Sequence, residues 1–182
     1  MNIILASNSP RRKELLNSLK VKFSVIPSDY EEPKTTNLQP AKYAEFLAYN
    51  KALSVFNKNG GIVLGADTIV VLDGKILNKP VDEADAIRML KSLSSNTHKV
   101  ITGYAVISKD KTYVGHEETL VTFKELSEEL ILNYVKTKSP LDKAGAYGIQ
   151  DGVLLVDKIV GDFDNVVGLP TKTIKKILDN FN

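Results

Sequence analysis

The chain has 182 residues, of which 43% are hydrophobic and 25% are charged, so it is long enough for one sizeable core and has an ordinary globular composition. Its net charge of +2 argues against general nucleic-acid binding. The sequence contains no cysteine and only His98 and His116 as histidines, which excludes disulfides and argues against cysteine-ligated or histidine-rich metal sites. Catalysis would therefore use carboxylate, lysine, arginine and hydroxyl groups, with a hard oxygen-liganded cation such as magnesium.

The N-terminal segment predicts a strand, a polar turn and a helix in close succession. Residues Ile3 to Ala6 are typical of a short buried strand, Ser9 of a helix N-cap and Pro10 of a first helical position. Positions 11–13 are all basic and fall at the positive end of the helix dipole, where each cation costs roughly 0.3 to 1 kcal/mol. A bound phosphate would reverse that cost, so the pattern predicts an anion site, with a solvated basic turn as the alternative.

The rest of the chain alternates between strand and helix patterns, which predicts a mixed α/β fold. We expect strands at 22–26, 62–72, 98–108, 112–123 and 153–160, with a hairpin turn at Asp73-Gly74. We expect helices from Pro40 to about residue 56 and at 82–93, 127–135 and 171–178, and a long loop at 138–152. The sequence has neither an apolar run of membrane length nor a signal-peptide pattern, so we expect a soluble, cytoplasmic protein.

Asp67 is the second strong signal for function. It interrupts the nearly continuous apolar strand 62–72, where a carboxylate is costly to bury unless it is paired, hydrogen-bonded or bound to metal. Its sequence neighbours offer no charge partner, so the partner must come from elsewhere in the fold. The candidates are Lys51, Lys79, Arg11, Arg12, and Glu32 through a shared cation. The alternative is a carboxylate that caps a strand bulge beside Gly65.

The segment Asp142 to Gln150 combines charged side chains, glycines and an amide. This composition suits a close approach of the backbone to a ligand, and it is equally typical of a flexible turn. The sequence contains neither the Walker nor the Rossmann glycine pattern, so neither of those nucleotide-binding loops is expected.

Six motifs together resemble the Maf family of nucleoside triphosphate pyrophosphatases. They are residues 4–12 (ILASNSPRR), 65–70 (GADTIV), 78–80 (NKP), 98–103 (HKVITG), 142–150 (DKAGAYGIQ) and 165–170 (NVVGLP), in family order over nearly the whole chain. The resemblance implies one Maf-like domain over residues 1–182, with a two-lobed mixed-sheet α/β fold like that of inosine triphosphate pyrophosphatases and an active site between the lobes. It further implies a divalent cation, Mg²⁺ or Mn²⁺, and suggests a homodimer.

The resemblance also implies roles for individual residues. Asp67 would be the catalytic residue that accepts a proton from the attacking water, and Glu32 and Asp67 would be the metal ligands. The expected substrate-binding residues are Ser7, Arg11, Arg12, Lys51, Thr68, Lys79 and Gln150. Arg12, Thr68 and Gln150 match the branch of the family that acts on dTTP and UTP. An amide at position 150 suits a pyrimidine, because it can donate to a carbonyl and accept from the ring N–H.

The expected function is therefore hydrolysis of dTTP and UTP, and of modified pyrimidine nucleotides as further candidates, to the monophosphate and pyrophosphate. One alternative is a nucleotide-binding regulator of septum formation and cell division, and another is a 7-methyl-GTP pyrophosphatase. Intact Asp67 and Lys79 argue against an inactive enzyme. Ser139 departs from the family pattern, which often has an acidic residue before Pro140, and leaves Asp142 as the nearest carboxylate. We expect neither nucleic-acid nor membrane partners.

Overall fold

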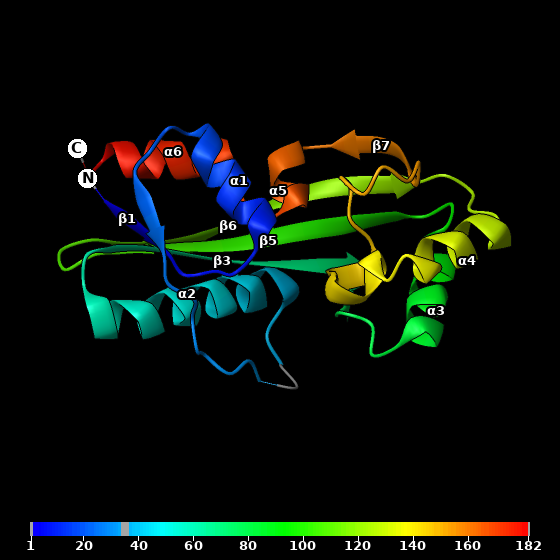
Figure 1. The fold of residues 1–182 in the computed structure, drawn as a ribbon, viewed down its shortest axis with the longest axis horizontal. Coiled ribbons are helices and arrows are strands. Elements are labelled where there is room, and N and C mark those ends of the chain that lie inside the picture. The colour runs from blue at the N-terminus through cyan, green and yellow to red at the C-terminus, as the bar shows by residue number, and fades with distance from the viewer. Residues whose placement is uncertain (1, 34–36, 182) are drawn as a thin grey trace. The chain divides into compact units, whose positions relative to one another are not determined.

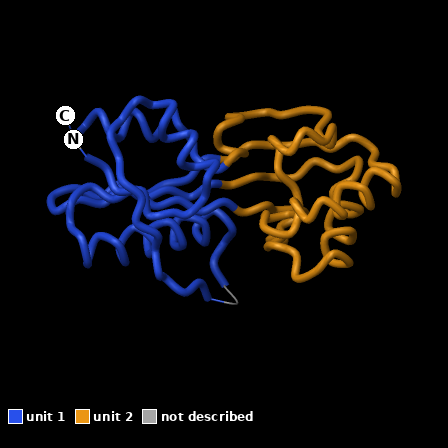
Figure 2. Tube along the Cα trace, in the orientation of Figure 1, with its two compact units in different colours: residues 1–68, 102–117, 168–182 blue, residues 69–101, 118–167 orange. Residues whose placement is uncertain are grey.

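The structure, a computed structural model, describes residues 2–33 and 37–181. The chain divides into two compact units, coloured separately in Figure 2. The first unit comprises residues 1–68, 102–117 and 168–182, and the second comprises 69–101 and 118–167. The assignment of residues 1–182 to a single Maf-like domain stays a prediction.

Seven strands form one mixed sheet, which confirms the expected α/β class. They are β1 (Ile3–Leu5), β2 (Phe23–Val25), β3 (Ile62–Leu72), β4 (Lys75–Leu77), β5 (Thr97–Ile107), β6 (Thr112–Phe123) and β7 (Val156–Val160). The strand order is β2-β1-β3-β5-β6-β7, with β4 paired to β3. β1 is parallel to both of its neighbours, β2 and β3. β4 is antiparallel to β3, and β7 is antiparallel to β6.

Helices connect the strands as the sequence periodicity predicts. They are α1 (Pro10–Ser18), α2 (Pro40–Asn59), α3 (Glu83–Leu93), α4 (Glu128–Lys136), α5 (Phe163–Val167) and α6 (Thr171–Asp179). Two short 3₁₀ helices, η1 (Ser139–Asp142) and η2 (Ala144–Ala146), lie in the segment that was expected to be a loop. Across the described residues, none of the helices has the length and apolar character needed to cross a membrane.

In the first unit, helices cover both faces of the sheet (Figure 1). α1 and α6 pack on one face, where their leucines and isoleucines join those of β1 and β3 around Leu16, Leu64 and Ile174. α2 packs on the other face, where its alanines and Val55 meet Val63. Because successive strand residues point to opposite faces, β3 supplies even-numbered residues to α1 and α6 and odd-numbered residues to α2.

In the second unit, α3 and α4 pack with the η2 segment around a core of aliphatic and aromatic side chains. Phe123 and Tyr147 lie edge to face in this core, with ring centroids 4.8 Å apart. Residues 138–152 therefore form the expected long connection, and its two short 3₁₀ helices pack it against the core of the second unit.

Other details differ from the expectations, and α2 ends at Asn59 instead of near residue 56. The last strand begins at Val156 and not at Val153, since Val153 and Leu155 turn inward to the core of the second unit. The helix α5 was not predicted, because five residues provide too little periodicity to identify. The predicted start of α1 is confirmed, since the Ser9 side chain accepts a hydrogen bond from the backbone N–H of Arg12.

Candidate active site

β3 presents Asp67 and Thr68 to opposite faces of the sheet. Asp67 has the odd-numbered parity of Val63 and therefore faces α2, where its side chain is 12% exposed. Thr68 has the parity of Leu64 and faces α1. The alternation of the strand thus assigns one polar group to each side of the sheet.

α2 lies unusually close to β3 and β5. A side chain at Gly65 would overlap the carbonyl oxygen of Ala48, and one at Gly103 would overlap that of Ala44. The two glycines, opposed by alanines on α2, allow the backbones to approach. This close packing brings Lys51, which lies one turn from Ala48 on α2, within reach of Asp67.

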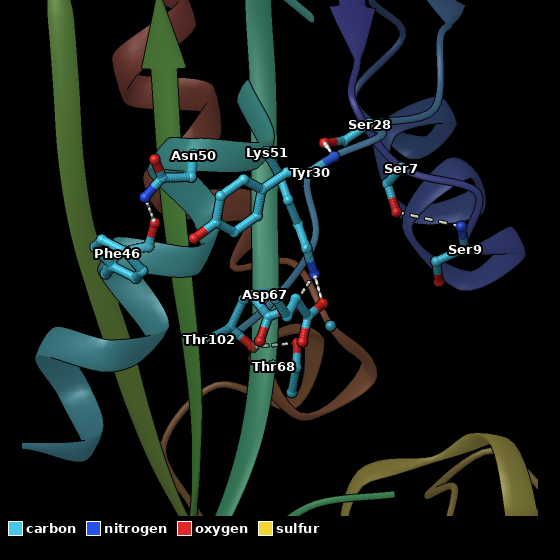
Figure 3. A network of polar contacts seen from close by, with 12 residues as sticks. Ser7, Ser9, Ser28, Tyr30, Phe46, Asn50, Lys51, Asp67, Thr68 and Thr102 are labelled. Atoms are coloured by element: carbon cyan, nitrogen blue, oxygen red, sulfur yellow. Dashed lines mark hydrogen bonds and ion pairs between the residues drawn. The ribbon is translucent and has the colours of Figure 1, made fainter. Parts of the chain in front are cut away.

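Lys51 joins the two carboxylates that the family resemblance implies as metal ligands. Its ammonium group lies 2.5 Å from Oδ1 of Asp67 and 2.6 Å from Oε1 of Glu32. Figure 3 shows the Lys51 side chain reaching from α2 to Asp67 on β3. Lys51 and Asp67 are largely buried, at 16% and 12% side-chain exposure, whereas Glu32 is 47% exposed. Of the partners proposed for Asp67, the structure therefore selects Lys51, and the strand-bulge alternative is not needed to explain the buried carboxylate.

The surroundings of Asp67 raise its pKa. Burial is the main cause, and the positive charges of Lys51 and Arg12 oppose it without cancelling it. The negative charge of Glu32 adds to the increase. A carboxylate whose pKa is raised in this way is a better proton acceptor than an ordinary one, which is what general-base catalysis needs.

The segment that carries Glu32 is held on α2 by several polar contacts. Ser28 shares a hydrogen bond of 2.8 Å with Ser54, and Tyr43 donates to the carbonyl of Pro33 over 3.2 Å. Burial and the nearby charges of Glu32 and Asp67 raise the pKa of Tyr43, so it remains a neutral donor. Tyr43 was not among the site residues expected from the sequence.

On the opposite face of β3, Arg12 binds three segments of the chain. Its Nε donates to the carbonyl of Gly168 over 2.8 Å, and its two Nη groups donate to Oγ of Ser7 over 3.3 Å and to Oγ1 of Thr68 over 3.0 Å. Each Nη carries a second hydrogen, so the guanidinium can still donate to an anion. Burial lowers the pKa of Arg12, and the charge of Asp67 opposes that effect.

Arg11 lies beside Arg12 in the first turn of α1 and is partly buried. Its charge contributes to the lowered pKa of Arg12, so the two cations share one region of the first unit. Seven of the nine residues predicted to bind substrate or metal, Arg11 among them, thus fall in the first unit. The other six are Ser7, Arg12, Glu32, Lys51, Asp67 and Thr68.

The second unit carries the other two predicted substrate-binding residues, Lys79 and Gln150, both exposed. Lys79 follows β4 and precedes the buried Pro80. The carbonyl of Asn78, next to Lys79, accepts a hydrogen bond of 3.2 Å from the backbone N–H of Gly145. The segment that carries Lys79 is therefore tied to the segment that leads to Gln150.

Two residues that contribute to this arrangement lay inside the recognised motifs without an assigned role. Thr102, fully buried on β5, shares a hydrogen bond of 2.9 Å with Thr68. Gly168 supplies the carbonyl that orients Arg12. Neither has a sequence signal of its own, because a buried threonine and a glycine carbonyl acquire their meaning only from the partners that folding brings to them.

The site offers two carboxylates as possible metal ligands. Within residues 2–33 and 37–181, no cluster of three or more histidine, aspartate or glutamate side chains could hold an ion by itself. Glu32 and Asp67 meet at Lys51 through one oxygen each, which leaves a second oxygen on each carboxylate. Mg²⁺ commonly binds through one or two carboxylates together with substrate phosphates and water, so this pair fits a cation that arrives with a nucleotide.

Comparisons with known proteins agree with the motifs. The model of the family described as "Maf-like protein" matches residues 2–181. A protein of Thermosipho africanus named dTTP/UTP pyrophosphatase is 53% identical over 179 residues, which cover 98% of this chain and 92% of that protein. A protein of Bacillus cereus with the same name is 51% identical over 182 residues, covering 99% and 95% of the two chains. The Staphylococcus aureus Ham1 protein shares the fold, with a TM-score of 0.59 at 12% identity over 100% of both chains.

Proposed function

Because the chain belongs to the family of Maf-like proteins, we propose that it is a dTTP/UTP pyrophosphatase that hydrolyses dTTP and UTP to the monophosphate and pyrophosphate. The observation that carries the proposal is the buried carboxylate of Asp67, held 2.5 Å from the ammonium group of Lys51. The names of relatives that are about half identical over nearly the full chain support the choice of substrate.

In the proposed reaction, Asp67 accepts a proton from a water molecule as that water attacks the α-phosphorus. A bond forms between the water oxygen and the α-phosphorus, and the bond from the α-phosphorus to the α–β bridging oxygen breaks. Pyrophosphate leaves with the bridging oxygen and its electron pair. Lys51 and the arginines of α1 stabilise the negative charge that develops on the phosphate oxygens.

A divalent cation, Mg²⁺ or Mn²⁺, is proposed as cofactor, held by Glu32 and Asp67 together with phosphate oxygens. When bound, it would supply positive charge to the phosphates. Lys51 keeps the two carboxylates together and neutralises part of their charge before the nucleotide binds. The remaining proposed substrate contacts are Ser7, Arg11, Arg12, Thr68 and Lys79 to the nucleotide, and Gln150 to the base.

Gln150 is proposed to select the base. Uracil and thymine present a carbonyl at position 4 and a ring N–H at position 3, which one amide can meet with its N–H and its carbonyl. Because nucleoside triphosphates are cytoplasmic metabolites, we also propose the cytoplasm as the compartment. A homodimer is proposed from the family resemblance alone, and light scattering of the purified protein tests it.

The proposal is tested by incubating the protein with dTTP, UTP, CTP, dGTP and 7-methyl-GTP plus magnesium or manganese, and measuring pyrophosphate separately from phosphate. We expect pyrophosphate from dTTP and UTP, and its loss in Asp67→Asn. Asp110→Asn makes the same change in the exposed turn after β5 and should leave turnover unchanged. Turnover of 7-methyl-GTP alone would replace the proposed substrate. Binding without any turnover would favour the regulator of cell division.

A further inference from the structure

Gln150 lies at the tip of a turn that is closed at both ends. The backbone N–H of Asp151 donates to the carbonyl of Gly148 over 3.1 Å, so residues 148–151 form a β-turn with Ile149 and Gln150 at its centre. Ile149 packs against the core of the second unit, whereas Gln150 is exposed. The turn thus fixes the Ile149 side chain in the core and leaves the Gln150 side chain exposed to solvent.

A partly buried polar network holds this turn. The hydroxyl of Tyr134 accepts a hydrogen bond of 2.9 Å from the N–H of Gly148 and donates one of 2.6 Å to Oδ2 of Asp151. The same carboxylate oxygen accepts 2.7 Å from the hydroxyl of Ser139 and lies 3.5 Å from the ammonium group of Lys143. One phenol and one carboxylate therefore tie both ends of the turn to α4 and η1.

Lys143 supplies the charge at the base of the network. Its side chain is only 8% exposed, and its ammonium group donates to the carbonyl and the hydroxyl of Ser139 over 2.6 and 2.9 Å and to Oδ1 of Asp142 over 2.8 Å. These three bonds use all three of its donors. Burial, with a contribution from the Asp151 carboxylate, raises the pKa of Tyr134, which therefore stays protonated as a donor.

Gly148 shows how closely the turn lies on the ion pair. A Cβ at this position would lie 2.5 Å from Oδ1 of Asp151 and 2.7 Å from Cε of Lys143, so these two side chains would have to shift to admit it. Ser139, which departs from the acidic residue common in the family, belongs to the same network as both acceptor and donor. The network consequently includes a residue that the proposed mechanism does not use.

A glutamine amide alone discriminates poorly between uracil and cytosine. The two bases exchange donor and acceptor at positions 3 and 4, and an amide that can turn over satisfies either pattern. Selectivity for uracil therefore requires that the amide be presented in one orientation, and the backbone that carries it is the part the network holds.

We propose that Asp151 and Lys143, through Tyr134 and Ser139, are positioning residues that fix the turn 148–151 and so make Gln150 selective for uracil and thymine over cytosine. This inference rests on the proposed function of Gln150 as the group that reads the base. It assigns the choice of pyrimidine to a network whose members need not touch the substrate.

The test compares kcat and KM for UTP and CTP in the wild type and in Asp151→Asn, with Asp157→Asn on the exposed face of β7 as the matched control. Hydrogen exchange of the peptide 144–153 is measured in parallel. In Asp151→Asn we expect the ratio of kcat/KM for UTP to that for CTP to fall about tenfold, mainly through the KM for UTP, with faster exchange in the turn. The control should match the wild type in both readouts.

The inference would be overturned if a folded Asp151→Asn variant kept the wild-type ratio of kcat/KM for UTP to that for CTP, for example because kcat/KM fell equally for both nucleotides. A wild type that does not prefer UTP to CTP would also overturn it. Should Asp151→Asn fail to fold, Ser139→Ala removes two bonds of the network and is judged by the same ratio, and Ser139→Thr should restore it. If the wild type releases no pyrophosphate, the proposed function fails and the selectivity inference fails with it. Selective wild-type turnover with an unaffected variant would overturn the inference alone.

Discussion

Replacing Lys51 with methionine isolates the interaction on which the proposed chemistry depends. The substitution keeps an unbranched side chain of similar length on α2 but removes the charge that contacts both Asp67 and Glu32. In the wild type, Lys51 and Arg12 both lower the pKa of the buried Asp67 carboxylate, and Lys51 has the larger effect. The substitution leaves only Arg12, on the other face of the sheet, to stabilise the carboxylate charge.

The expected cost in stability follows from the burial of the pair. Removing one partner of a buried ion pair costs about 3 to 5 kcal/mol, because it leaves the other charge uncompensated. We expect about 3 kcal/mol, the lower end of that range, since Glu32 is half exposed and Asp67 can accept a proton. The value of kcat/KM for UTP should fall by about 10²- to 10³-fold, because a developing charge loses its stabilising cation.

The pH dependence has a definite sign. Asp67 has a raised pKa in the folded state, so between its unfolded and folded pKa values the folded form binds more protons than the unfolded form. Stability therefore falls as the pH rises from the unfolded to the folded pKa. Lys51→Met raises the pKa further and extends the loss to higher pH. The difference in unfolding free energy from the wild type, measured by urea denaturation, should be larger at about pH 8 than at about pH 5. The acid limb of the kcat/KM profile should move to higher pH.

Lys58→Met is the matched control, because Lys58 lies on the same helix and pairs with Asp29 where both side chains are more than half exposed. It should change neither activity nor the pH dependence of stability. A Lys51→Met variant as stable and active as this control would refute the electrostatic account of the site. Adding Asp67→Asn to Lys51→Met should abolish the extra pH dependence without restoring turnover.

Two further predictions concern packing inside each unit, at Gly65 in the first and at His98 in the second. Gly65→Ala should destabilise the protein by about 3 kcal/mol and reduce turnover, because the new Cβ would overlap the carbonyl of Ala48; an unchanged melting temperature would contradict the close approach of α2 to β3. His98 is 1% exposed, and burial lowers its pKa to about 4. Its folded form therefore binds fewer protons than the unfolded form, so its contribution to stability should be lost as pH falls from about 6.5 to about 4, by about 3 kcal/mol in total. Between about pH 6.5 and pH 4, the free energy of unfolding of His98→Gln should fall less steeply than that of the wild type. Equal slopes in the two proteins would argue against a neutral buried imidazole.

Features that depend on neighbouring residues were predictable from the sequence. The hairpin at Asp73-Gly74 was expected from the dipeptide, and both residues adopt the positive φ that such a turn requires. The start of α1 followed from Ser9 and Pro10 for the same local reason. The missed helix α5 and the two 3₁₀ helices lacked such signals, because elements of three to five residues are stabilised by packing and not by periodicity.

The interaction partners of the polar site residues could not be predicted from the sequence. The sequence indicated that Asp67 needs a distant partner, since the cost of burying a carboxylate is evident from its apolar neighbours. Only the tertiary structure selected Lys51, because the close approach of α2 at Gly65 and Gly103 determines which lysine can reach the strand. Likewise, the bonds of Arg12 to Thr68 and Gly168 and the network beneath Gln150 join residues far apart in the chain, and such contacts depend on distances that no local pattern encodes.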